Sequence, residues 1–110
     1  MIAVGKWCQQ KKRGTSSDVG LVPPPAPFVH ETAGDLIQDA TGLDDTGGLL
    51  RLFEGPTEFG PWTLYGQVNW DPSWNWGAIV GFTGPFIMAT ETGNGLTYAG
   101  ESPPSDAFAL

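Results

Sequence analysis

The sequence predicts a small all-β domain, a five-stranded antiparallel meander that curls into a partial barrel or sandwich. Three observations support this fold class. The 110 residues include 16 Gly and 10 Pro, a composition that favours turns over long helices. Apolar and polar residues alternate with a period of two through much of residues 49–101. Gly-Pro steps at Gly55, Gly60 and Gly84 separate the alternating segments.

The length allows a single domain with two appendages. We expect an extended arm over residues 1–30, a β domain over 31–101 and a C-terminal tail over 102–110. Within the β domain, a short helix or loop over 31–47 precedes strands over 48–101.

The N-terminal arm is basic and then Pro-rich. Four of the five cationic residues lie among the first 13 residues, and no acidic residue accompanies them. Pro23, Pro24, Pro25 and Pro27 favour an extended polyproline II strap, whose end Phe28 and Val29 would anchor on the core. The arm is interpreted either as a segment that docks on an acidic surface or as a solvated leader.

At most one short helix is expected after the arm, with a loop as the alternative. Thr32-Ala33-Gly34-Asp35 resembles a capping box, and Gly42 stands where a helix-ending glycine would. The following Asp44–Gly48 segment is interpreted as a structural loop, because it lacks the spaced oxygen ligands of a calcium loop.

The strands are expected in sequence order, at residues 49–54, 62–70, 74–83, 86–92 and 96–101. Asp71-Pro72-Ser73 and Gly84-Pro85 supply turns, and Gly93-Asn94-Gly95 carries the strongest hairpin signal. Glycines alternate along one side of 74–83, so we expect tryptophan rings to pack over glycines across the sheet. The tail, with Phe108 and Leu110, is expected to enter an apolar groove that could belong to a neighbouring subunit.

No residue set predicts catalysis, a metal site or a cofactor. Cys8 and His30 are the only residues of their types. The carboxylates considered for glycoside hydrolysis by a small hydrolase are Glu54, Glu58, Asp71 and Glu91, but nothing in the sequence places two of them opposite each other. We therefore expect a protein that is not an enzyme.

The tryptophans allow two interpretations. Trp62 and Trp70 share parity with Leu64 and Val68, which favours a place in the core. Alternatively, exposed coplanar indoles at Trp74 and Trp76 would form a carbohydrate-binding module.

A compact β body with long Pro-bearing arms and no catalytic set looks like a virion structural component, especially a decoration (cement) or minor capsid protein of a bacteriophage. This resemblance is one of layout alone. It implies a non-enzymatic interaction protein of a larger symmetric assembly, whose arms staple neighbouring subunits. The candidate partner-binding residues are Lys11, Lys12, Arg13, Phe28, Trp74, Trp76, Phe108 and Leu110.

The expected partners are capsid or other virion proteins, or further copies of the chain, with carbohydrate as the alternative ligand. Nucleic acid is disfavoured because residues beyond the arm are strongly acidic. The longest weakly polar run, Gly77–Ala89, is too short to cross a membrane and is interrupted by Gly84-Pro85. We expect a virion protein assembled in the host cytoplasm, or otherwise a soluble cytoplasmic one.

Overall fold

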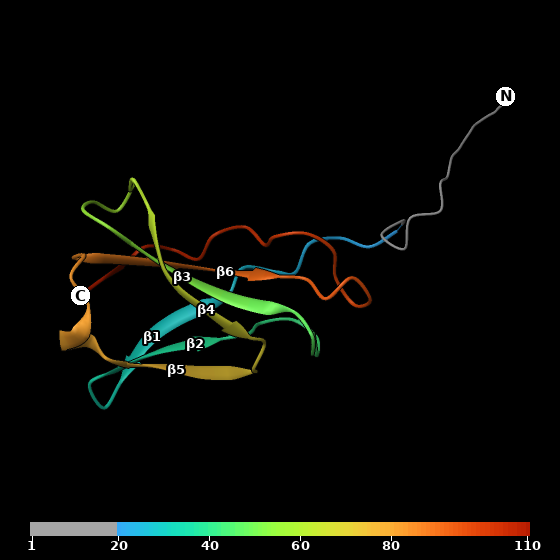
Figure 1. The fold of residues 1–110 in the computed structure, drawn as a ribbon, viewed down its shortest axis with the longest axis horizontal. Coiled ribbons are helices and arrows are strands. Elements are labelled where there is room, and N and C mark those ends of the chain that lie inside the picture. The colour runs from blue at the N-terminus through green and yellow to red at the C-terminus, as the bar shows by residue number, and fades with distance from the viewer. Residues whose placement is uncertain (1–19) are drawn as a thin grey trace, which may run out of the picture.

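The computed structural model describes residues 20–110, which form seven strands in two antiparallel sheets (Figure 1). Sheet A has the order β1-β2-β5, with bounds Phe28–Thr32, Asp35–Asp39 and Ser73–Ala78. Sheet B has the order β4-β3-β6-β7, with bounds Thr63–Asn69, Leu49–Gly55, Phe86–Thr92 and Phe108–Ala109. A single 3-10 turn, η1 (Ile79–Gly81), is the one helical element of this part of the chain. The predicted all-β antiparallel class is confirmed.

The predicted helix is wrong, because its residues form the β1–β2 hairpin. Thr32 pairs with Asp35, and the two residues between them have positive φ angles, 54° at Ala33 and 85° at Gly34. Positive φ at both central residues is the conformation of a two-residue type I′ turn. As a strand, β2 buries Leu36 while its backbone is paired on both sides, whereas a two-turn helix would be marginal.

The four predicted strands from residue 49 to residue 92 exist, but they do not form a simple meander. The central strand β3 pairs with both β4 and β6, while β5 crosses to sheet A and pairs with β2. Strand β5 ends at Ala78, and the chain turns through η1 before β6.

The predicted fifth strand, 96–101, is a loop that keeps only one bridge, between Thr92 and Glu101. The Oδ1 of Asn94 accepts hydrogen bonds from the backbone N–H groups of Leu96 and Thr97, each at 2.7 Å. These bonds curl the chain locally after Gly95, so the hairpin signal produces a tight loop in place of a second strand.

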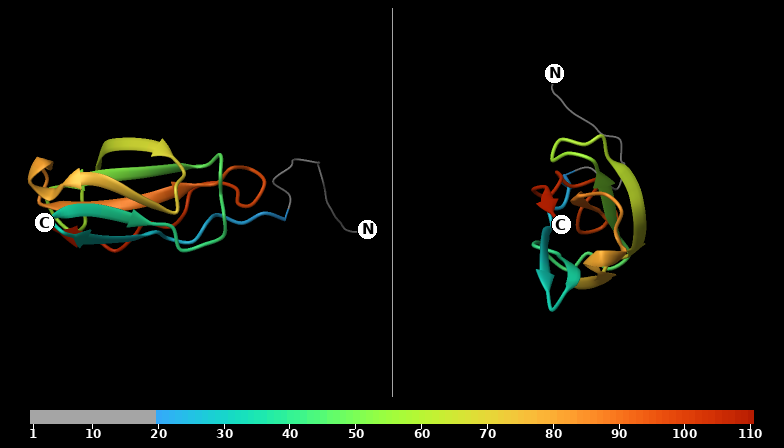
Figure 2. Two further views of the ribbon diagram at one scale, coloured as in Figure 1. Left: turned by 90° about the horizontal axis from the view of Figure 1, so that it is seen from below. Right: turned by 90° about the vertical axis from the view of Figure 1, so that its left-hand side faces the viewer.

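Two β-bulges close one side of the body. The register shifts between Leu36 and Ile37 and between Leu52 and Phe53 leave one extra residue in each partner strand, Trp76 in β5 and Tyr65 in β4. The two rings meet edge to face, with centroids 6.2 Å apart. The bulges therefore aim an aromatic residue of each sheet at the other sheet. In Figure 2, the view along the long axis shows β4 and β5 coming together on this side.

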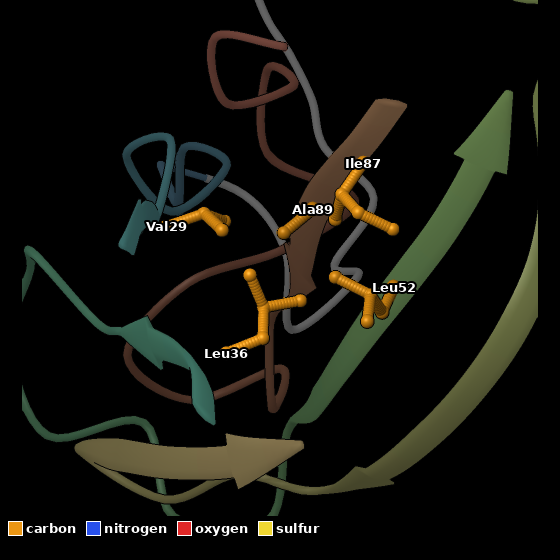
Figure 3. Close-up of a cluster of buried hydrophobic side chains, with 5 residues drawn as sticks. All are labelled: Val29, Leu36, Leu52, Ile87 and Ala89. Atoms are coloured by element: carbon orange, nitrogen blue, oxygen red, sulfur yellow. The ribbon is translucent and has the colours of Figure 1, made fainter. Parts of the chain in front are cut away.

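The buried core lies between the sheets and consists of aliphatic side chains (Figure 3). Sheet A contributes Val29 and Leu36, and sheet B contributes Leu52, Ile87 and Ala89. Burial of each large member stabilises the fold by about 1.5–3 kcal/mol.

The four described tryptophans, Trp62, Trp70, Trp74 and Trp76, are half-buried around the core and none is fully enclosed. The glycines of 74–83 that suggested packing under rings, Gly77 and Gly81, have no atom within 4 Å of an added Cβ, whereas rings pack over glycines at two other places. A Cβ on Gly55 would stand 2.8 Å from the Trp62 ring, and one on Gly66 would stand 3.3 Å from the Trp76 ring.

The strap and the tail both lie on the body. The N–H of Ala99 donates to the carbonyl of Val22 at 3.0 Å, and Pro24 and Pro27 are buried. The part of the arm that the structure describes therefore forms an extended strap over residues 21–27, and residues 28–30 belong to β1. Val29 anchors the strap's end in the core, whereas Phe28 is 57% exposed.

The C-terminal segment 101–110 covers the free edge of β6. The backbone N–H groups of Ser102 and Ser105 donate to the carbonyls of Glu91 and Ala89, at 2.8 and 2.9 Å. In return, the N–H groups of Glu91 and Ala89 donate to the serine hydroxyls, both at 2.9 Å. The groove expected for the tail is thus on its own sheet.

Candidate interaction surface

An open groove separates β1 from the C-terminal segment. Residues 26–30 form one wall and residues 104–108 the other, around a volume of ≈ 440 Å³. Pro27, Phe28, Pro104 and Phe108 give the groove an apolar character, and Asp106 adds a carboxylate. We call this feature the β1 groove. It follows the side of the body opposite the Tyr65–Trp76 contact, where the two sheets do not join (Figure 2).

The groove contains two of the predicted partner-binding residues, Phe28 and Phe108. Phe28 lies beside His30 on β1, with the rings stacked 5.3 Å apart and inclined by 21°. Phe108 is half-buried and packs against the core, while the terminal Leu110 is 40% exposed. Lys11, Lys12 and Arg13 lie outside the described residues.

The other two predicted residues, Trp74 and Trp76, lie away from the groove on β5. Their rings are inclined by 81°, with centroids 6.3 Å apart, so they do not form the coplanar surface that was considered for sugar stacking. The Trp76 Nε1–H donates to Gln38 Oε1 at 2.9 Å, and Gln38 is fully buried. Trp76 therefore belongs to the closure between the sheets.

The described body is strongly acidic. All but one of the chain's 12 acidic residues follow residue 20, and Arg51 is the sole Lys or Arg in this part. Arg51 is already engaged, with its Nη1 2.8 Å from Glu101 Oε1. The body thus offers an anionic surface without an unpaired basic side chain among residues 20–110.

A buried polar cluster lies where β6 ends beneath the loops 44–48 and 93–97. Asp45 is fully buried and Glu91 is 1% exposed. Asp45 Oδ2, both Glu91 carboxylate oxygens and the Trp70 indole N–H are buried without a hydrogen-bond partner. Burial raises the pKa of Glu91 to about 8, the neighbouring Asp45 carboxyl adds to the rise, and the Trp70 indole N–H opposes it.

The cluster ties the two loops together through Asp45. Its Oδ1 accepts a hydrogen bond from the N–H of Asn94 at 3.0 Å. Two carboxylates can bond to each other only when one carries a proton, so a protonated Glu91 supplies the missing donor for Asp45. Nothing in the residue pattern of β6 marked Glu91 as an inward-facing acid apart from its shared parity with Ile87 and Ala89.

The outer face of sheet A carries a series of hydrogen-bonded side chains that resembles a catalytic triad in residue types. His30 Nε2 is 2.7 Å from Asp39 Oδ2, and His30 Nδ1 is 2.9 Å from Thr32 Oγ1. Asp39 Oδ1 also accepts a bond from Ser73 Oγ at 2.6 Å. No sequence motif predicts this set of hydrogen bonds, which links β1, β2 and β5. Thr32 lies on an exposed surface and is not among the groove-lining residues. We therefore interpret these side-chain hydrogen bonds as structural contacts between strands.

The carboxylates considered for glycoside hydrolysis are dispersed. Glu54 Oε1 accepts bonds from the N–H groups of Thr83 and Gly84, both at 2.8 Å, and so holds the loop before β6. Asp71 Oδ1 accepts a bond from the N–H of Ser73, Glu58 is exposed, and Glu91 is buried with Asp45.

Residues 20–110 contain no group of three His, Cys, Asp or Glu side chains placed to bind a metal ion. None of the helical segments in that range is long and apolar enough to cross a membrane.

No protein-family model matches the sequence, and no curated protein matches it significantly. The functional argument therefore rests on the groove, the charges and the sheet edges.

Proposed function

We propose that this chain is a non-enzymatic structural protein that joins neighbouring subunits of a larger symmetric assembly. The observation that carries the proposal is the separation of charge along the chain. Residues 1–13 hold four cations and no acid, while the body from residue 20 onward has one cation, Arg51, which is paired with Glu101. Because the basic segment finds no counter-charge within itself and the body finds almost none, each copy can attract the next.

The layout favours a decoration or minor capsid protein of a bacteriophage as the class of assembly protein. A small β body supplies a rigid unit, and the basic segment that precedes it in the sequence supplies the charge that attracts a neighbour. Each contact of this kind is weak in salt, so stable attachment requires many identical contacts, as a symmetric particle provides.

Self-association of the full chain tests the proposal. Sedimentation velocity at about 20 mM and about 500 mM NaCl should show larger species at low salt, because the Debye length falls severalfold over this range. The triple variant Lys11→Gln, Lys12→Gln, Arg13→Gln should lose most of the low-salt association.

Arg51→Gln is the matched control, since it removes a cation from the body and should leave the salt response unchanged. Negative-stain electron microscopy of the low-salt species should show particles with a regular repeat. A chain that stays monomeric at all salt and protein concentrations would contradict the proposal.

A further inference from the structure

We propose that the β1 groove receives residues 1–4 of a second copy of this chain, which lie there as an extended strand beside β1. This inference rests on the proposed assembly function and names the surface that the assembly uses.

The edge strands β1, β4, β5 and β7 each pair with a single neighbour, and β1 is the one whose free edge borders the apolar groove. The edge of β6 is covered by residues 101–110, and the edges of β4 and β5 meet through Tyr65 and Trp76. Among residues 20–110, β1 pairs with β2 alone. Its sequence, FVHET, contains no Lys or Pro, and its register with β2 has no shift. Lysine, proline and a register shift discourage strand addition at an edge, and β1 has none of them.

The dimensions of the groove suit a short strand. Strand β1 has five residues, which extend over about 17 Å, and a four-residue strand beside it would extend over about 13 Å. A strand in this position would take hydrogen bonds from the free edge of β1 and cover the exposed ring of Phe28. It would also fill the seam between β1 and the tail, where the two sheets remain apart.

The first four residues match the groove in chemistry. Met1, Ile2, Ala3 and Val4 are all apolar, as most of the groove walls are, and Lys6 follows two residues later. Acidic side chains stand at the groove and beside it, Asp106 in the wall and Glu31 next to His30 on β1. The apolar residues 1–4 therefore match the apolar walls of the β1 groove, and Lys6 matches the acidic side chains beside it.

A second copy is the donor that the chain path favours. The strap over residues 21–27, drawn in blue, already occupies the path to β1, and it begins at the end of the body remote from the C-terminus (Figure 1). Residues 1–4 of the same chain would have to return along their own strap. The 19 residues that precede Gly20 could extend over as much as about 63 Å, enough to reach a neighbouring body.

Disulfide trapping between two full-length variants tests the donor and the site together. Both variants carry Cys8→Ser; one adds Ala3→Cys in the donor segment and the other adds Ala107→Cys in the groove wall. Mixed under mild oxidation, they should form a disulfide between positions 3 and 107, identified by mass spectrometry of the joined peptides, because docking brings the two Cα atoms within bonding range. Val80→Cys, on a residue that is 90% exposed and outside the groove, is the control and should not form this bond.

Surface substitutions provide an independent measurement. Phe28→Lys removes an aromatic wall and adds a charge that repels Lys6, so it should raise the dissociation constant for self-association about tenfold or more. Val80→Lys makes the same charge change at an exposed apolar residue outside the groove and should have little effect. Ile2→Asp with Val4→Asp should match Phe28→Lys at low salt, because both variants remove the same apolar contact.

The outcomes separate this inference from the proposed function. If the wild-type chain associates but neither the cross-link nor the Phe28→Lys effect is found, the groove assignment is wrong and the assembly proposal stands. If a chain that carries both cysteines bonds only within itself, the groove takes its own N-terminus and the second-copy inference is overturned. If the wild-type chain never associates, both proposals fail.

Discussion

Replacing Glu91 by Gln should stabilise this protein at alkaline pH and flatten the pH dependence of its unfolding. The pKa of Glu91 is about 8 in the folded chain, against 4.5 for an unperturbed glutamate. Because the folded state holds the proton more tightly than the unfolded state, the stability from this group is fully present below pH 4.5. It is lost progressively between pH 4.5 and about pH 8, and it changes no further above that.

The size of the effect follows from the shift. One pKa unit corresponds to about 1.4 kcal/mol, which sets an upper limit of about 5 kcal/mol on the loss across this window. The cluster lies beneath two loops at the end of β6, so solvent screening reduces the value, and we expect about 2 kcal/mol. That is a large fraction of the stability of a domain of this size.

Glutamine has nearly the shape of glutamic acid and stays neutral at every pH, and its amide N–H can donate to Asp45 in place of the carboxyl proton. Urea unfolding followed by tryptophan fluorescence at intervals from about pH 5 to about pH 9 measures the free energy of unfolding. The wild type and Glu91→Gln should agree near pH 5 and diverge as the pH rises. Glu58→Gln removes the same charge from an exposed residue and should keep the wild-type slope. A wild-type free energy that is constant from pH 5 to pH 9 would refute the buried proton, and so would equal flattening by Glu58→Gln.

Two further substitutions, Gly55→Ala and Leu52→Ala, and one limited digestion test the fold. Gly55→Ala should destabilise the domain by about 1–3 kcal/mol, because its Cβ would stand 2.8 Å from the Trp62 ring, whereas Gly81→Ala has no atom within 4 Å of the new Cβ and should be close to neutral in the same unfolding assay. Leu52→Ala should cost about 2–5 kcal/mol, since the side chain is fully buried in the two-sheet core; a loss below about 1 kcal/mol would place the core elsewhere. Limited trypsin digestion should cut after the cations of residues 1–13 and spare Arg51, which lies in β3 and is paired with Glu101; early cleavage at Arg51 would show that β3 opens in the native protein.

Two of the strands that the sequence predicted correctly, β3 and β6, have a buried face with regular alternation. In β3, Leu50 and Leu52 are fully buried, and in β6 Ile87 and Ala89 are, so a period of two was visible in the residues themselves. The order of the strands was not visible, because nothing in the residues of β5 indicates that it pairs with β2 and not with β4.

The hairpin that replaced the helix shows the opposite case. Its turn uses Ala33 and Gly34. Because alanine at positive φ is uncommon, this pair does not predict a type I′ turn as Asn-Gly would. Asn94-Gly95 does carry that signal, yet the Asn94 side chain bonds to Leu96 and Thr97 and makes a loop. At the hairpin the burial of Leu36 between paired neighbours decided the outcome, and at the loop the local bonds of the Asn94 side chain did.

The partner-binding residues of the arm, Lys11, Lys12 and Arg13, stay a prediction, and the structure adds a different kind of candidate. An open sheet edge depends on which strands pair, so no composition or motif could reveal the β1 groove before the topology was known.

The tail explains why β1 and not β6 is the edge available to a partner. Ser102 and Ser105 each engage one residue of β6 twice, by a backbone N–H and by a side-chain hydroxyl. A hydroxyl that accepts a hydrogen bond can replace a strand carbonyl, so a Pro-containing segment that cannot form a regular strand still satisfies the edge of β6. Nothing comparable lies along β1 among residues 20–110. The edge of β6 is thus closed by side chains of the tail, whereas the edge of β1 is left unpaired beside an apolar groove. This difference is best explained if another copy of the chain completes the edge of β1.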